Sequence, residues 1–425
     1  MMSDYTKMWE NLGLNLKAHS GLLSVLSDAY KDIYLSQKDR PKGMGYFDFV
    51  VSEIHGLRIE EIIKAKEEGK KVVGSFCVYV PEELVLAANG VSIGLCAGAD
   101  AGTEEAERFI PRNTCALIKA FMGFKLAGLC PYLETTDLIV GETTCDGKKK
   151  AYEIFNDITK KVYVMELPNM KSEQGKKLWL EEVKKFKEKI EQLSGKKITI
   201  EDLRKSAALV NGKRKALKRL SRLRAFDPEP ISGLDALLVN QVSFYDDPVR
   251  FTEMTNKLCD ELQERVDKSV GVAPKGSPRL LISGSPMAIP NWKLHFIAET
   301  SGSIVVGEES CVGERNFREL LDENFTDMND ALEKIASRYL SINCACFSPN
   351  DERIENIRSL VDSLHADGVI HYSLQFCTPY MMEAYKVEKA LENKTPILRI
   401  ETDYSMGDMG QLKSRVESFI EMLKK

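Results

Sequence analysis

The sequence lacks the short motifs that identify the commonest cofactor sites. Its 425 residues contain no C-x-x-C pair, which excludes a zinc ribbon and a ferredoxin-type cluster motif. No G-x-G-x-x-G follows an expected strand, and no G-x-S-x-G elbow is present, so the dinucleotide fingerprint and the hydrolase nucleophile are both missing. Residues 141–149 imitate a phosphate loop, but five residues separate the glycines and Lys149 replaces the required Ser or Thr, which excludes that motif too.

Long apolar runs, histidines and net charge are also scarce. No run approaches the roughly 18 apolar residues that span a bilayer, and the N-terminus lacks the basic and apolar regions of a signal peptide. The net charge of -5 gives no electrostatic case for nucleic acid. The five histidines show no metal-binding spacing, and only His371 is notable, because it leads toward Cys377. We therefore expect a cytoplasmic protein that binds neither membrane nor nucleic acid.

Short apolar runs alternate with helical patterns, which is typical of parallel α/β units. We expect two Rossmann-like (flavodoxin-like) lobes at 71–170 and 271–425, a helical N-terminal segment at 1–70 and a helical connector or cap at 171–270. Strands are expected at 71–76, 91–95, 137–140, 162–167, 279–283, 303–306, 341–346, 368–376 and 396–401. The basic stretch 213–224 carries seven positive charges; we favour a solvated helix face over a docking site for an acidic partner or anionic ligand.

The sequence does contain ten cysteines, which a reducing cytosol keeps from forming structural disulfides. A single cysteine is most often a buried core residue, and we assign Cys130 and Cys259 to packing. The others follow or end expected strands, or begin a helix: Cys77, Cys96, Cys115, Cys145, Cys311, Cys344, Cys346 and Cys377. Ligands of open α/β sheets bind beyond the carboxyl ends of the strands, and thiolate-rich sites favour iron–sulfur or zinc. The pattern predicts one metal site shared between the lobes.

Several stretches carry a family resemblance. CVYVPEEL at 77–84, TCDGKK at 144–149, QFCTPY at 375–380 and the tail 400–417 resemble the 2-hydroxyacyl-CoA dehydratase / benzoyl-CoA reductase family. Within that family, NCACFSPN at 343–350, together with Cys96 and Cys311, is similar to the double-cubane cluster proteins. The resemblance covers residues from about 45 to 425.

The resemblance implies an oxygen-sensitive iron–sulfur cluster. The dehydratases hold one [4Fe-4S] cubane with three cysteines, whose matching positions are Cys115, Cys145 and Cys377. The double-cubane members join two cubanes into [8Fe-9S], and the second trio would be Cys96, Cys311 and either Cys344 or Cys346. The last two share one parity along an expected strand, so both can face the cluster. The role of Cys77 stays open.

The resemblance also implies a function. It is a low-potential reductase of a small-molecule substrate, reduced by a separate ATP-hydrolysing activator that carries its own [4Fe-4S] cluster, and built as a homodimer. The alternatives are a subunit of a 2-hydroxyacyl-CoA dehydratase, a non-catalytic electron carrier and a zinc protein. Six polar residues near the expected ligands are candidates for substrate contact or for ordinary hydrogen bonding, and no catalytic residue is assigned among them: Glu142, Glu308, Glu309, His371, Ser373 and Gln375.

Overall fold

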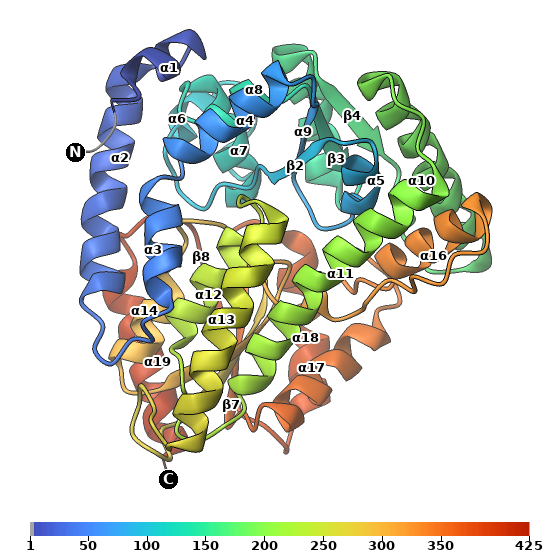
Figure 1. Ribbon diagram of the computed structural model, residues 1–425. Coiled ribbons are helices and arrows are strands. Elements are labelled where there is room, and N and C mark those ends of the chain that lie inside the picture. Colours follow the sequence, from blue (N-terminus) through green and yellow to red (C-terminus); the bar gives the residue numbers. More distant parts are fainter. Residues whose placement is uncertain (1–3, 425) are drawn as a thin grey trace.

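Two four-stranded parallel sheets form the centre of the two lobes (Figure 1). The computed structural model describes residues 4–424. The first sheet contains β1 (Val72–Ser75), β2 (Val91–Gly94), β3 (Leu138–Glu142) and β4 (Val162–Met165). The second contains β5 (Arg279–Gly284), β6 (Ile304–Glu309), β7 (Gly368–Leu374) and β8 (Ile397–Thr402). The predicted fold class, two Rossmann-like α/β lobes with additional helices, is confirmed.

Both sheets have the same strand order. The first runs β2-β1-β3-β4 and the second β6-β5-β7-β8, with all pairs parallel, as in Val73 opposite Leu138 and Leu280 opposite Gly368. The order reverses between β1 and β3 and between β5 and β7, and α/β proteins place ligands beyond the carboxyl ends of such neighbouring strands. Each lobe therefore presents a natural ligand-binding edge.

Helices cover the sheets and link the lobes. The N-terminal ones are α1 (Thr6–Asn11), α2 (Leu16–Tyr30), the π-helical turn η1 (Lys31–Leu35), α3 (Met44–Ser52) and α4 (Leu57–Glu67). The first lobe adds α5 (Glu82–Ala87), α6 (Thr103–Ala106), α7 (Ala116–Leu126), α8 (Pro131–Thr135) and α9 (Asp146–Thr159). The connecting helices are α10 (Glu173–Ser194), α11 (Ile200–Leu223), α12 (Gly233–Val242) and α13 (Pro248–Asp267). The second lobe adds α14 (Lys293–Thr300), α15 (Glu314–Phe317), α16 (Met328–Leu340), α17 (Asp351–Ser363), α18 (Thr378–Leu391) and α19 (Met409–Leu423).

The expected strand at 341–346 is wrong, because the chain after α16 forms an irregular loop. A short apolar run becomes a strand only where another strand pairs with it, and this segment packs against the first lobe instead. Tyr79 Oη donates to the Ile342 carbonyl at 2.9 Å, and Asn350 Nδ2 donates to the Cys344 carbonyl at 2.9 Å. The loop therefore brings Cys344 toward the space between the lobes.

The basic stretch 213–224 is not a solvated helix face, and that interpretation is wrong for its most important residues. Lys213, Arg214 and Arg224 are buried on or directly after α11. They pair with Glu82 at 2.6 Å, Glu83 at 2.7 Å and Glu308 at 2.7 Å, respectively. The first two partners belong to the first lobe and the third to the second lobe, so these charges bind the lobes to the connecting helix.

A capping box begins α11, and its loss should destabilise the protein. Thr199 Oγ1 accepts from the Asp202 amide at 3.2 Å, and Asp202 Oδ2 accepts from the Thr199 amide at 3.1 Å. We expect Thr199→Ala to lower the free energy of unfolding by about 1 kcal/mol, measured as a shifted midpoint in urea. The exposed Lys205 of the same helix serves as the control, since Lys205→Ala should change stability by less than about 0.5 kcal/mol. Equal midpoints for the two variants would contradict a stabilising cap.

No helix within residues 4–424 combines the length and the apolar character needed to cross a membrane.

Candidate cysteine-lined site between the lobes

Three cysteines directly precede helices and form the first thiol group. Cys115, Cys145 and Cys377 are the N-cap residues of α7, α9 and α18, where the positive end of each helix favours thiolate. The Lys148 amide donates to Cys145 Sγ at 3.4 Å. Cys115 lies in the first lobe and Cys377 in the second. The structure thus places all three members of the expected first trio at helix N-termini, two of them across the lobe boundary.

Hydrogen bonding within this group separates the acidities of its thiols. The hydrogen bond between Cys115 and Cys377 lowers the pKa of Cys115 to about 7, and amide donors of α7 assist it. The same bond, together with burial, raises the pKa of Cys377 well above its usual range, because a second charge beside the first is unfavourable. Cys145 interacts electrostatically with both. The three thiols therefore act on one another as one titrating group.

A second thiol group lies at the other end of the lobe boundary. Cys77, directly beyond β1, is hydrogen-bonded to Cys311, which follows β6. Cys344 is hydrogen-bonded to Cys346 within the loop after α16, and it also interacts electrostatically with Cys311. Each bond raises the pKa of one thiol, Cys77 or Cys346, and lowers that of its partner. Sequence reasoning left Cys77 open, and the structure places it in this group.

Polar side chains surround the second group. Arg315 Nη1 lies 3.7 Å from Cys311 Sγ, and Tyr380 Oη lies 3.3 Å from Cys344 Sγ. Arg315 is held in turn by a bond of 2.6 Å from its Nε to Glu309 Oε1. A buried guanidinium beside a thiol favours the thiolate form that metals require.

Cys96 stands slightly apart from both groups. Its Sγ donates to the Phe76 carbonyl at 2.8 Å, and burial raises its pKa to about 12. It interacts electrostatically with Cys311. Cys130 and Cys259 belong to hydrophobic clusters, as expected, and burial raises the pKa of each to about 12.

A buried lysine faces both thiol groups, and sequence reasoning did not single it out. Lys148 lies in the first turn of α9, is 7% exposed, and donates from Nζ to the Phe76 carbonyl at 3.3 Å. That carbonyl also accepts from Cys96. The charge of Lys148 acts on cysteines of both lobes: Cys77, Cys96, Cys115, Cys145 and Cys311. The available signal was its place in TCDGKK, three residues after the cap of a helix.

The polar candidates divide into paired residues and one unpaired carboxyl. The Arg224 charge and hydrogen bond overcome burial and hold the pKa of Glu308 at about 2. Arg315 and Arg353 do the same for Glu309. Within residues 4–424, both carboxyl oxygens of the fully buried Glu142 lack a hydrogen-bond partner, and burial raises its pKa to about 7.

The remaining candidates are held by backbone contacts or burial. A ring nitrogen of His371 lies 3.0 Å from the Tyr380 carbonyl, and burial lowers its pKa to about 4. Ser373 is buried in β7. The Gln375 carbonyl accepts from the Ala116 amide at 3.4 Å, which joins the end of β7 to α7.

The donor set fits a cluster better than a single ion. Among residues 4–424, no three His, Cys, Asp or Glu side chains converge where one metal ion could bind. The thiolates of an iron–sulfur cluster make a different demand, because they bind separate iron atoms around an inorganic core. All ten cysteines are free thiols, and eight of them lie at this boundary with Lys148 and Arg315 as cationic neighbours. Donors of that chemistry suit an anionic, sulfur-rich group.

Residues 77–423 match the model of a family described as 2-hydroxyglutaryl-CoA dehydratase, D-component. One relative is YjiM of Escherichia coli (strain K12), which carries the name of a dehydratase subunit; it is 36% identical over 366 residues, 85% of this chain and 94% of that protein. The (R)-phenyllactyl-CoA dehydratase beta subunit of Clostridium sporogenes is 27% identical, over 85% and 94%. A benzoyl-CoA reductase component of Thauera aromatica is 23% identical, over 85% and 93%.

The matched region contains all the thiols of both groups, and its relatives are named as components of dehydratases and reductases. The resemblance expected from 77–84, 144–149 and 375–380 is thereby confirmed at the level of the family. The chain belongs to the 2-hydroxyglutaryl-CoA dehydratase, D-component family.

Proposed function

We propose that this chain is the reductase component of a system in which a separate ATP-hydrolysing activator supplies electrons. It holds a double-cubane [8Fe-9S] cluster and passes low-potential electrons to a small-molecule substrate. The observation that carries the proposal is the pair of thiol groups at the lobe boundary, each of which draws cysteines from both lobes. One [4Fe-4S] cubane needs only three of these thiols, so a single cubane would leave the second group without a role.

The first cubane is assigned to Cys115, Cys145 and Cys377. The second is assigned to Cys311, to Cys344 or Cys346, and to a third thiolate. Cys96 is the third thiolate suggested by the family resemblance, and the hydrogen bond to Cys311 supports Cys77 as its competitor. When bound, such a cluster supplies electrons at low potential.

The chain's own residues prepare the boundary for a negative charge. Lys148 and Arg315 contribute buried positive charge, and the helix ends at Cys115, Cys145 and Cys377 contribute partial positive charge. Tyr79, fully buried, packs beside the second group and excludes water from it. Burial strengthens each of these interactions, because the interior screens charge weakly. The unpaired Glu142 carboxyl lies close to Cys344 and is the buried acid nearest in character to a proton donor.

Iron and acid-labile sulfide, measured on protein purified without oxygen, test this proposal. We expect about eight iron and about nine sulfide per chain. About four of each would favour the dehydratase alternative, which the names of the relatives support. Zinc without sulfide would refute the iron–sulfur assignment. Reduction of a small molecule that requires both ATP and the activator would distinguish an enzyme from an electron carrier.

A further inference from the structure

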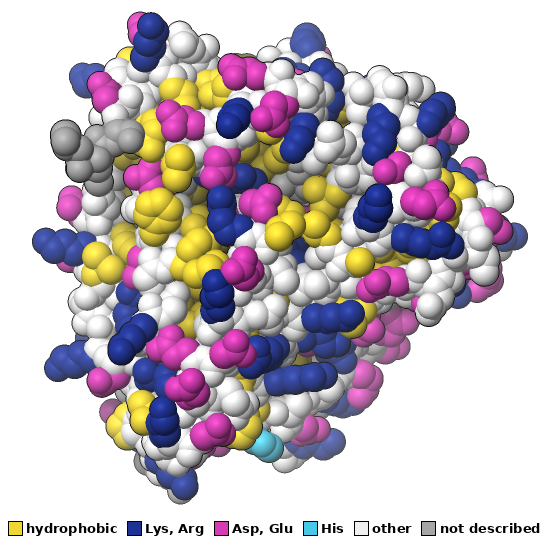
Figure 2. Space-filling view, viewed as in Figure 1, with side chains coloured by type: hydrophobic (Ala, Val, Ile, Leu, Met, Phe, Trp, Pro, Cys, Tyr) yellow, Lys and Arg dark blue, Asp and Glu magenta, His cyan; other side chains and the backbone are white. Residues whose placement is uncertain are grey.

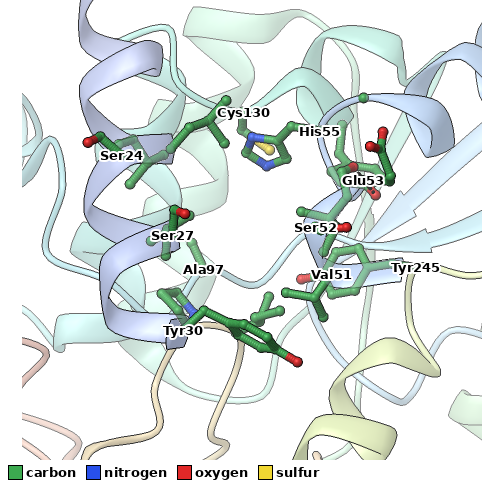
Figure 3. Close-up of a pocket in the computed structure, with 18 of the residues that line it drawn as sticks. Ser24, Ser27, Tyr30, Val51, Ser52, Glu53, His55, Ala97, Cys130 and Tyr245 are labelled. Carbon is green, nitrogen blue, oxygen red and sulfur yellow. Dashed lines mark hydrogen bonds between the residues drawn. The ribbon is translucent and has the colours of Figure 1, made fainter. Parts of the chain in front are cut away.

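The N-terminal helices and the first lobe enclose a cavity of about 750 Å³ that lies outside the two thiol groups (Figure 3). Its walls come from α2, α3, the residues beyond β2, and the segment that precedes α14. Most of the lining is apolar and includes Leu22, Leu26, Val51, Phe124 and Trp292. Ligand cavities of small molecules typically measure about 300–1,000 Å³ and are mainly apolar, so this one has a suitable size and character.

The inner wall of the cavity borders the cysteine site. Leu95, Cys96 and Ala97, directly beyond the carboxyl end of β2, line it. From that wall, Cys96 Sγ reaches the Phe76 carbonyl at 2.8 Å, and this carbonyl immediately precedes Cys77. Tyr245, also in the lining, donates from Oη to the Cys96 carbonyl at 3.0 Å. A molecule in the cavity would therefore lie against the residue that separates it from the second thiol group.

The charged groups of the lining already have partners or face solvent. Asp48 pairs with Arg40 at 2.8 Å, and Glu53 accepts from Tyr5 Oη at 2.7 Å. Lys31 is exposed. An anion in the deep part of the cavity would lose its hydration without gaining a buried cation, which is costly. The electrostatics thus favour an uncharged ligand.

A pair of neutral histidines supplies one hydrogen-bonding group. His19 Nε2 and His55 Nδ1 lie 3.0 Å apart, and burial lowers the pKa values to about 4 and about 3. Figure 3 shows the His55 ring turned into the cavity, opposite Ser27 and Tyr30 of α2. Within residues 4–424, Nε2 of His55 makes no hydrogen bond. It is therefore the ring atom that a ligand can contact.

The mouth of the cavity reaches the molecular surface beside exposed apolar residues. Leu35 and Phe49 are 56% and 52% exposed and belong to its lining. Figure 2 shows hydrophobic side chains gathered on the face over α2 and α3. An apolar molecule can enter from this face without passing between the lobes.

We propose that this cavity binds the small molecule on which the cluster acts, and that this molecule is uncharged and largely apolar, with one polar group placed at His55. The second half of this statement rests on the proposed function. The first half, a binding site for an uncharged apolar molecule, stands on the cavity alone.

Binding of prodan, an uncharged naphthalene dye with a carbonyl group, tests the site. Trp9 and Trp292 line the cavity, so energy transfer from tryptophan should report a dissociation constant on the order of micromolar. Val51→Trp and, on the opposite wall, Ser27→Trp fill the cavity and should weaken binding by about tenfold or more. Val25→Trp changes a residue of α2 that is 67% exposed and outside the lining, and should leave binding within about twofold. Circular dichroism verifies the fold of each variant.

Three outcomes would overturn the proposal: unchanged binding in both folded cavity variants, equally tight binding of the anionic dye anilinonaphthalene sulfonate, or a substrate of the loaded enzyme that does not compete with prodan. Iron and sulfide are counted in the same samples. Dye binding without iron would refute the proposed function and keep the binding site, whereas iron without dye binding would refute the site and keep the cluster.

Discussion

Cys377→Ala should remove at least about half of the iron from protein purified without oxygen, and should abolish substrate reduction. Cys377 is the thiol that carries the first group across the lobe boundary, through its hydrogen bond to Cys115. Its loss leaves two thiols for a cubane that needs three from the protein. The measurement is iron and sulfide per chain, together with the visible absorption of the reduced and oxidised protein.

The control for this variant is Cys259→Ala, since Cys259 is a buried core residue of α13 and should keep its full iron content. Comparison of Cys77→Ala with Cys96→Ala then identifies the third thiolate of the second group. Whichever variant loses iron contains the missing ligand. A Cys377→Ala protein with the iron content of the unaltered chain would contradict the assignment of the first cubane.

Glu309→Ala should destabilise the protein by about 3–5 kcal/mol, the cost of leaving buried charge unpaired. Glu309 is 1% exposed at the end of β6. It accepts from Arg315 at 2.6 Å, from Arg353 at 2.7 Å and from Ser283 at 2.7 Å. Removal of the carboxylate leaves two buried guanidinium groups without their shared partner. Urea unfolding followed by circular dichroism measures the change.

Glu253→Ala provides a matched control on the surface. Glu253 and Lys257 form an exposed pair at 2.6 Å on α13, with both side chains more than half exposed, and such pairs contribute little to stability. We expect this variant to unfold at the same urea midpoint as the unaltered chain. A Glu309→Ala variant no less stable than this control would show that the buried network does not hold the second lobe together.

The fold and the gathering of cysteines follow from local patterns in the sequence. Buried parallel strands are short apolar runs, and those at β1 and β5 are easily seen. The carboxyl ends of neighbouring parallel strands meet at one edge, so cysteines beyond β1, β3 and β7 had to approach the boundary. No such rule reveals that Cys77 pairs with Cys311, because that contact depends on how the two lobes pack.

The errors also have non-local causes. The loop at 341–346 looked like a strand, because its apolar residues face the first lobe and not a neighbouring strand of its own sheet. The burial of Lys213 and Arg214 depends on Glu82 and Glu83, which lie 131 positions earlier in the chain. A charge run indicates a solvated face only where the fold brings no partners to it.

The position of α11 limits how the molecule can move. Arg214 donates to Glu83 of the first lobe and, at 3.0 Å, to Tyr339 of the second, and both side chains of the ion pair are almost completely buried. Breaking such a pair costs about 3–5 kcal/mol, so conformers with the lobes swung apart would number fewer than about one in a hundred. Electrons must therefore arrive through the closed protein, by transfer across a docked surface, and the molecule works as a rigid frame instead of a clamp.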